Sequence, residues 1–179
     1  MSRIPYVPAD LGEPKEIVNA IRQRRGGGLL NLDRILLHCP EQAAGWNVFL
    51  GAVRRGGTLS PRLREIAICA VAALNKADYE FVHHGPELIK AGGTQAEVDA
   101  LEDVEKAVSN GEIFGSQERM VLQLVIELTR DVVVSADTLS RTRAELGGDA
   151  ALVELIIVIS AYNMVSRVIV ASGIRPEGE

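Results

Sequence analysis

A short stretch of the sequence concentrates the side chains that could move protons. Tyr79, Glu80, His83 and His84 fall within six positions, on a chain that is otherwise rich in aliphatic residues. Glu80 and His84 are four positions apart, so on a helix a carboxylate and an imidazole share one face. Histidine titrates near neutral pH, and a partly buried glutamate can be brought toward the same range. The pair is therefore a candidate for general acid and base catalysis.

Two simpler interpretations compete with this one. A glutamate and a histidine at this spacing also occur on solvated helices as plain charge complementarity. Glu80 and His83 match half of the glutamate and histidine pattern of di-iron bundles, but those bundles need a second such pair, which the sequence lacks. We therefore expect no metal.

Glu65 is the second informative carboxylate, because it lies on a predicted helix with an apolar stripe. The stripe consists of Leu63, Ile66, Ala67, Ala70, Val71 and Leu74. A carboxylate on the stripe side must be paired if it is buried. Cys69 follows four positions later, and with Cys39 it forms neither a CxxC pair nor a zinc site. We interpret Cys69 as a small buried hydrophobe, with a reactive thiol near a carboxylate as the alternative.

The helices that position these residues have clear start and stop signals. Ser60 followed by Pro61 predicts a helix start, and the helix should run to about Lys76. A helix over residues 78–90 should follow and end at two glycines, after which Thr94 and Glu97 form a capping box. Further helices are expected over residues 40–52, 95–107, 116–131, 135–146 and 149–172, and Val132 to Val134 are too short for a strand that stands alone.

These elements predict an all-α, compact multi-helix bundle. Residues 1–28 contain three prolines and a triple glycine, so they should form an N-terminal arm with a short helix near residues 16–22, and residues 29–179 should form one helical domain. A net charge of −5 argues against a protein that binds the phosphate backbone, so we expect no nucleic-acid partner. The apolar run of residues 150–161 is interrupted by Glu154 and fits a core helix better than a membrane span, and the first residues lack a secretory signal, so we expect a cytoplasmic protein.

Several segments resemble the carboxymuconolactone decarboxylase and alkylhydroperoxidase D-like superfamily. The resemblance is carried by residues 59–65 (LSPRLRE), 75–84 (NKADYEFVHH), 88–94 (LIKAGGT), 161–167 (AYNMVSR) and the segment from LHCP at 37–40 to WNVF at 46–49. It covers most of the chain after residue 29. It implies a helical fold of the alkylhydroperoxidase D-like type and a homo-oligomer, such as a trimer or hexamer.

The peroxidase branch of that superfamily has a glutamate, two cysteines twelve and fifteen positions later, and a histidine at nineteen. The matching residues here are Glu65, Ala77, Glu80 and His84. The glutamate and the histidine of this family pattern, which relay protons, are kept here, while both cysteines are replaced. Hydroperoxide reduction by a dithiol therefore lacks its nucleophile and its resolving thiol.

In the decarboxylase branch, a lactone that bears a carboxylate loses carbon dioxide, and the dienolate that remains is reprotonated at carbon without a cofactor. The resemblance then implies that His84 is the general acid or base, that Glu65 orients and charges it, and that Glu80 is a second carboxylate facing the substrate. The implied substrate contacts are Tyr79, His83, Trp46 and a cation, either Arg167 or Arg64. Core packing of Trp46 and a surface or interface role for the arginines are the alternative interpretations.

Three functions follow from these residues. The leading hypothesis is a cofactor-independent lyase or isomerase that acts on a small, cyclic or unsaturated carboxylic acid. The second is an alkylhydroperoxidase-like antioxidant protein, which the loss of the cysteine pair disfavours. The third is a non-catalytic helical oligomer whose polar cluster only stabilises its interface.

Overall fold

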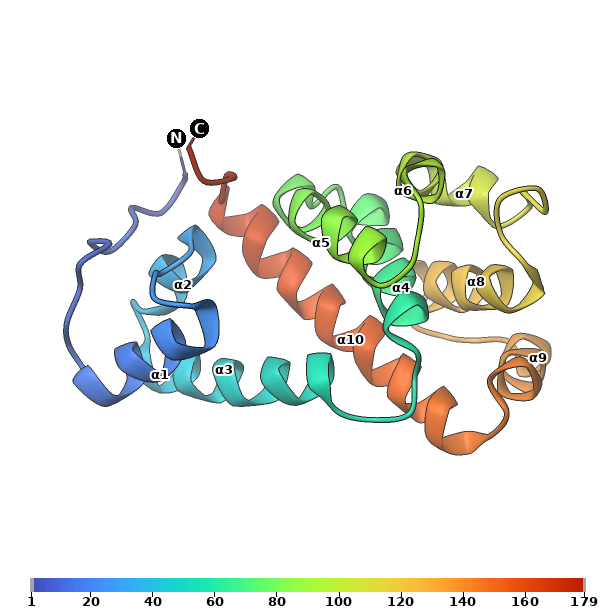
Figure 1. The fold of residues 1–179 in the computed structure, drawn as a ribbon, viewed down its shortest axis with the longest axis horizontal. Helices are drawn as coiled ribbons and strands as arrows, with labels where there is room; N and C mark the ends of the chain where they lie inside the picture. Colours follow the sequence, from blue (N-terminus) through green and yellow to red (C-terminus); the bar gives the residue numbers. More distant parts are fainter. Residues whose placement is uncertain (1, 179) are drawn as a thin grey trace. The chain divides into compact units, whose positions relative to one another are not determined.

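The computed structural model describes residues 2–178 (Figure 1). Throughout this range the regular elements are helices and no strand occurs, which confirms the predicted all-α fold. The chain divides into two compact units, each packed mainly within itself. Unit 1 contains the residues up to 56 together with those from 168 onward, and unit 2 contains residues 57–167.

Unit 1 is built on helices α1 (Lys15–Arg25), α2 (Asn31–Leu36) and α3 (Pro40–Arg55). Val18, Ile21, Leu37 and Ala43 form its buried apolar cluster. Helix α1 is longer than the short helix expected near residues 16–22, and it ends at Gly26, whose φ of 81° is the left-handed conformation that glycine adopts without strain. The boundary predicted after residue 28 stays a prediction.

The central helix of unit 2 is α4 (Pro61–Leu74), and its start follows the predicted signal. The Ser60 hydroxyl accepts a hydrogen bond from the Leu63 backbone N–H at 3.2 Å, while Pro61 occupies the first helical turn. Residues 66–72 are fully buried. Three of them are alanines, which allow helices α5 and α8 to pack closely against α4.

Helix α5 (Asp78–Lys90) follows after a tight turn and has the predicted bounds. Lys76 in this turn has a φ of 55°, a left-handed conformation that is uncommon for a residue with a side chain. Gly85 lies against the next part of the chain, because a Cβ placed there would be 3.2 Å from Cγ1 of Val98. The turn and this close approach determine the position and orientation of α5, and with them where Glu80 and His84 lie.

The single helix expected over residues 95–107 is interrupted. The structure has α6 (Gln95–Ala100), a 3-10 turn (Leu101–Asp103) and α7 (Val104–Ala107). The capping box predicted at Thr94 and Glu97 is confirmed. The interruption has a local cause that the prediction missed, since the Asp103 carboxylate accepts the Lys106 backbone N–H at 3.2 Å and begins a new helix.

Unit 2 is completed by α8 (Ser116–Arg130), α9 (Ala136–Leu146) and the part of α10 (Asp149–Ser172) that ends at Arg167. Helix α8 packs against α4 and α9. Val132 has a φ of 64°, which lies outside the range of a regular extended strand.

Helix α10 is long and apolar enough to span a membrane by length and composition alone. Its most apolar window has a mean hydropathy of 1.8, and 56% of that window is buried within the protein. The buried residues include Leu155, Val158, Ile159 and Tyr162. A buried core helix gives the same composition.

Candidate functional site

Helices α4 and α5 bring together the carboxylate and the imidazole that the sequence singled out. Oε2 of Glu65 lies 2.6 Å from Nδ1 of His84. The Glu65 side chain is 14% exposed and the His84 side chain 10% exposed. Glu65 is therefore paired, as a carboxylate on the buried side of α4 must be, and the short distance is typical of a charge-assisted hydrogen bond.

This hydrogen bond determines which nitrogen of His84 is available for chemistry. A carboxylate only accepts, so Nδ1 of His84 carries the hydrogen and donates it to Glu65. In the neutral imidazole, Nε2 is then the basic nitrogen. A carboxylate that fixes the tautomer and stabilises the imidazolium is the arrangement that general acid and base catalysis by histidine requires.

Glu80 lies one helical turn before His84 on α5 and is 2% exposed. The Ser166 hydroxyl of α10 donates a hydrogen bond to Oε2 of Glu80 at 3.1 Å. Tyr162, also on α10 and fully buried, packs edge-on against the His84 ring with 5.0 Å between the ring centroids. Two residues four apart on α10 thus contact two residues four apart on α5.

Tyr162 and Ser166 are the site residues that sequence analysis missed. Both lie in the segment 161–167, which carried the family resemblance, but Arg167 was chosen there because it is charged. A usable signal existed. Tyr162 and Ser166 are polar residues four positions apart, the same spacing as Glu80 and His84, on a helix that is mostly apolar.

The supporting residues Tyr79 and His83 contact each other on α5. Their ring centroids are 4.3 Å apart, and Tyr79 is 4% exposed. Nδ1 of His83 lies 2.7 Å from the Tyr79 carbonyl oxygen, which can only accept, so this nitrogen also carries a hydrogen. A role for either residue in substrate binding stays a prediction.

The predicted cations have partners within unit 2. Nη1 of Arg167 donates to the Asn163 carbonyl oxygen at 2.7 Å and to Oδ1 of the same residue at 3.0 Å. Nη2 of Arg64 donates to the Leu59 carbonyl oxygen at 3.1 Å and lies 3.5 Å from Oε1 of Glu154. These contacts anchor the arginines to nearby backbone, and their contact with a substrate stays a prediction.

Two further residues named from the sequence can be placed. Trp46 lies on α3 in unit 1 and is partly exposed, so its contribution to substrate binding stays a prediction. Cys69 is fully buried on α4. Burial, followed by the negative charges of Glu65 and Glu80, raises the pKa of the Cys69 thiol well above its usual range. Such a thiol stays protonated and is a poor nucleophile.

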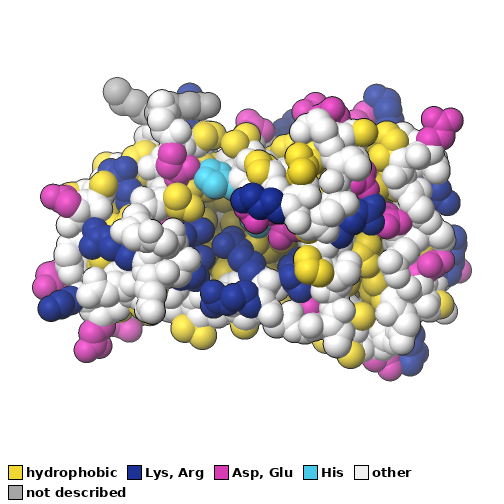
Figure 2. All heavy atoms as spheres, in the orientation of Figure 1, with side chains coloured by type: hydrophobic (Ala, Val, Ile, Leu, Met, Phe, Trp, Pro, Cys, Tyr) yellow, Lys and Arg dark blue, Asp and Glu magenta, His cyan; other side chains and the backbone are white. Residues whose placement is uncertain are grey.

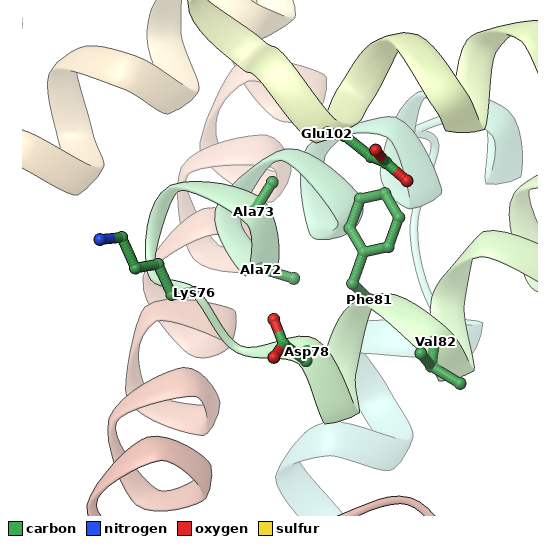
Figure 3. Close-up of a pocket in the computed structure, with 7 residues that line it drawn as sticks. All are labelled: Ala72, Ala73, Lys76, Asp78, Phe81, Val82 and Glu102. Carbon is green, nitrogen blue, oxygen red and sulfur yellow. The ribbon is translucent and has the colours of Figure 1, made fainter.

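A hollow of unit 2 lies on other faces of α4 and α5. It has a volume of about 500 Å³ and is lined by Ala72, Ala73, Lys76, Asp78, Phe81, Val82 and Glu102. Figure 3 shows the Phe81 ring rising from α5 toward Glu102, while the Lys76 side chain points away from that ring. Glu65, Glu80 and His84 are not among its lining residues. Among the residues that the structure describes, no group of three or more metal-binding side chains occurs.

Part of the chain matches the model of a known protein family. Residues 40–113 match the model of the carboxymuconolactone decarboxylase family. This segment contains α4 and α5, and with them Glu65, Glu80 and His84. A search of curated proteins finds no match.

Solved structures of two bacterial proteins have the same fold. An uncharacterized peroxidase-related protein from Ralstonia eutropha JMP134, described as an alkylhydroperoxidase AhpD core, has a TM-score of 0.84 and 20% identity, and the match covers 99% of this chain and 93% of that chain. An uncharacterized peroxidase-related protein from Silicibacter sp. TM1040 has a TM-score of 0.81 and 18% identity, with 99% and 92% covered. At these identities the likeness is one of fold.

Proposed function

We propose that this chain is a cofactor-independent lyase or isomerase acting on a small carboxylic acid, a proposal that the match of residues 40–113 to the carboxymuconolactone decarboxylase family model supports. A cyclic, lactone-like acid is the substrate class that fits best. The observation that carries the proposal is the 2.6 Å hydrogen bond between Glu65 and His84, formed by two mostly buried side chains. It supports a positioned acid and base rather than a solvated surface pair.

His84 performs the proton transfer in this proposal. Loss of carbon dioxide from the substrate carboxylate leaves the bonding electron pair on the substrate, delocalised as a dienolate. Nε2 of the His84 imidazolium protonates the dienolate at carbon, and a proton from water restores the imidazolium. In an isomerase reaction the same nitrogen first removes a proton from carbon and then returns it at a different carbon.

The two carboxyl groups have different tasks. Glu65 accepts the Nδ1 hydrogen of His84, which holds the ring and stabilises its charged form. Glu80 is the second carboxyl group, one turn before His84 and hydrogen-bonded to Ser166.

The proposal is tested by screening small cyclic carboxylates and lactones for a thermal shift, followed by assays for carbon dioxide release and for double-bond migration. We expect at least one acid to be turned over by the wild type and not by His84→Ala. The matched control is His38→Ala, because His38 is an exposed histidine of unit 1 whose Nε2 contacts the Pro5 carbonyl oxygen at 2.7 Å. Equal rates for both variants would contradict the proposal.

A non-catalytic role makes a different prediction for the same variants. If the polar cluster only stabilises the fold or an interface, His84→Ala lowers the melting temperature and no acid in the screen is turned over by any form. Turnover by the wild type with loss in His84→Ala therefore separates the two functions. The variant's melting temperature must be measured together with its rate.

We also propose that the chain self-associates, as a trimer or hexamer in the cytoplasm. Val153, Ile157 and Met164 of α10 are spaced as one helical face, and their exposed fractions are 53%, 43% and 38%. Apolar faces of this kind are commonly covered by another subunit. Light scattering at several concentrations tests the assembly, and a monomer at all of them would contradict it.

A further inference from the structure

A cluster of four arginines in unit 1 has no role in the proposed chemistry. Arg24 and Arg25 end α1, and Arg54 and Arg55 end α3. The two helices pack against each other, and the apolar cluster of unit 1 contributes to this packing. Figure 2 shows Lys and Arg side chains, in dark blue, gathered over the part of the chain that α1, α2 and α3 form.

One buried carboxylate serves two of these arginines. Nε and Nη2 of Arg25 donate to the two oxygens of Asp33 at 2.9 and 3.0 Å, and Nη2 of Arg24 lies 3.5 Å from Oδ1. Oδ2 also accepts the Leu30 backbone N–H at 3.0 Å. The Asp33 side chain is 2% exposed and is occupied by these contacts. It binds Arg24 and Arg25 into the fold of unit 1.

Arg24 lies in an excess of positive charge. Its Nε donates to Oδ1 of Asn47, which is neutral, and its side chain is 10% exposed. Burial lowers the pKa of Arg24 to about 10; the neighbouring charges of Arg25, Arg54 and Arg55 act in the same direction, and Asp33 opposes them. An anion bound beside Arg24 would offset the free-energy cost of holding its positive charge in these surroundings.

Arg55 lies on the same face of α3 as Asn47, the residue that accepts a hydrogen bond from Arg24. A Cβ built on Gly51 would be 2.8 Å from Nη2 of Arg55, so the guanidinium lies back over the helix at Gly51. Gly51 is one turn after Asn47, which holds Arg24. Within residues 2–178, the Arg55 guanidinium and Nη1 of Arg24 donate no hydrogen bond. Two cationic donors are thus oriented over adjacent turns of one helix.

From this geometry we infer that Arg24 and Arg55 form a binding site for a small oxyanion, over the face of α3 made by Asn47 and Gly51. The ligand class is a small molecule with a carboxylate or phosphate group. The planar fork of a guanidinium matches either group through paired hydrogen bonds. Gly51 contributes by having no side chain, which leaves room for the Arg55 guanidinium.

The site is tested by calorimetric titration of the full chain. The probes are inorganic phosphate and succinate, each compared with sodium chloride at equal ionic strength, which also separates a phosphate from a carboxylate preference. We expect saturable binding of at least one probe, and at least a tenfold loss of affinity in Arg55→Gln, because a charge-assisted hydrogen bond is lost. No saturable binding of either probe would overturn the inference.

Two further variants separate a positioned site from general attraction by charge. Gly51→Ala keeps the net charge, and its added Cβ displaces the Arg55 guanidinium, so we expect weaker binding with the helical circular dichroism signal retained. Arg141→Gln removes one exposed arginine of unit 2 and should bind like the wild type. Equal losses in Arg141→Gln and Arg55→Gln, or unchanged binding in Gly51→Ala, would overturn the site.

Discussion

Glu65 and His84 are joined by a 2.6 Å hydrogen bond although nineteen positions separate them in the sequence. The contact depends on two helices and the turn between them. Helix α4 begins at the Ser60 cap, and the left-handed Lys76 allows α5 to begin at Asp78. The pair is therefore a property of the helix arrangement and not of a local sequence motif.

The first prediction concerns the charge of Glu65. Glu65→Gln keeps the shape of the side chain but presents an amide, which both donates and accepts, so Nδ1 of His84 is no longer required to carry the hydrogen. We expect the rate with an identified substrate to fall about 10²–10⁴-fold. The ¹⁵N chemical shifts of the His84 ring should report a changed tautomer population without any substrate.

The control for this variant is Glu41→Gln, because Glu41 is an exposed glutamate in the first turn of α3. It should leave both the rate and the His84 ring shifts as they are in the wild type. If Glu65→Gln also leaves the ring shifts unchanged, Glu65 does not set the tautomer of His84. The proton-transfer role assigned to the pair would then be wrong.

The second prediction concerns Ser166. Ser166→Ala removes the hydroxyl that donates to Oε2 of the buried Glu80. We expect the free energy of unfolding to fall by about 1–3 kcal/mol, since a buried charged or polar group loses a donor. Chemical denaturation measures this loss, and in the Glu80→Gln background the same substitution should cost less.

Ser160→Ala is the matched control for Ser166→Ala. Ser160 is an exposed serine on the same helix, so its loss should change the free energy of unfolding by less than about 0.5 kcal/mol. An equal effect at both positions, or full additivity with Glu80→Gln, would show that Ser166 does not stabilise Glu80.

The parts of the fold that could be predicted from the sequence are those with local causes. The helix start at Ser60 and Pro61 and the capping box at Thr94 and Glu97 depend on residues three or four positions apart, and both are present in the structure. The break at Asp103 also has a local cause, but the apolar spacing of residues 95–107 continues through it and concealed the new cap.

The contacts that could not be predicted join segments far apart in the chain. Ser166 meets Glu80 across 86 positions, and the spacing within each helix does not reveal which faces meet. Arg167 was predicted to bind substrate because it is charged, yet its guanidinium contacts Asn163 on its own helix. The contacts of Asp33 with Arg24 and Arg25 could not be predicted either, because Asp33 lies in a short helix with no distinctive sequence pattern.

The third prediction concerns hydroperoxides. The positions of the two family cysteines are Ala77 and Glu80, and the buried Cys69 thiol has a raised pKa. We expect no turnover of hydrogen peroxide or an organic hydroperoxide with a dithiol reductant, because the family's cysteine pair is absent and the buried Cys69 thiol stays protonated. Consumption that is lost in Cys69→Ala and kept in Cys39→Ala would contradict this and favour the antioxidant function.

The fourth prediction follows from the same thiol and concerns stability at alkaline pH. Burial, with a further contribution from Glu65 and Glu80, raises the pKa of Cys69 in the folded protein. In the unfolded chain a thiol titrates near its ordinary pKa of about 8.5. The stability linked to this proton is fully present below that pH, and it is lost as the pH rises toward the folded pKa, because the unfolded chain releases the proton first.

We therefore expect the free energy of unfolding of the wild type to fall above about pH 8.5, relative to Cys69→Ala, with a limiting slope of about 1.4 kcal/mol per pH unit. Chemical denaturation from pH 7 to pH 10 measures both slopes. Cys69→Ala lowers the stability at every pH because it leaves a small cavity, but only the difference in slope tests the linkage. Cys39→Ala removes an exposed thiol and should keep the wild-type slope. Parallel curves for the wild type and Cys69→Ala would show that Cys69 ionises equally in the folded and unfolded chain, and thus that its surroundings are not those of a buried thiol beside two carboxylates.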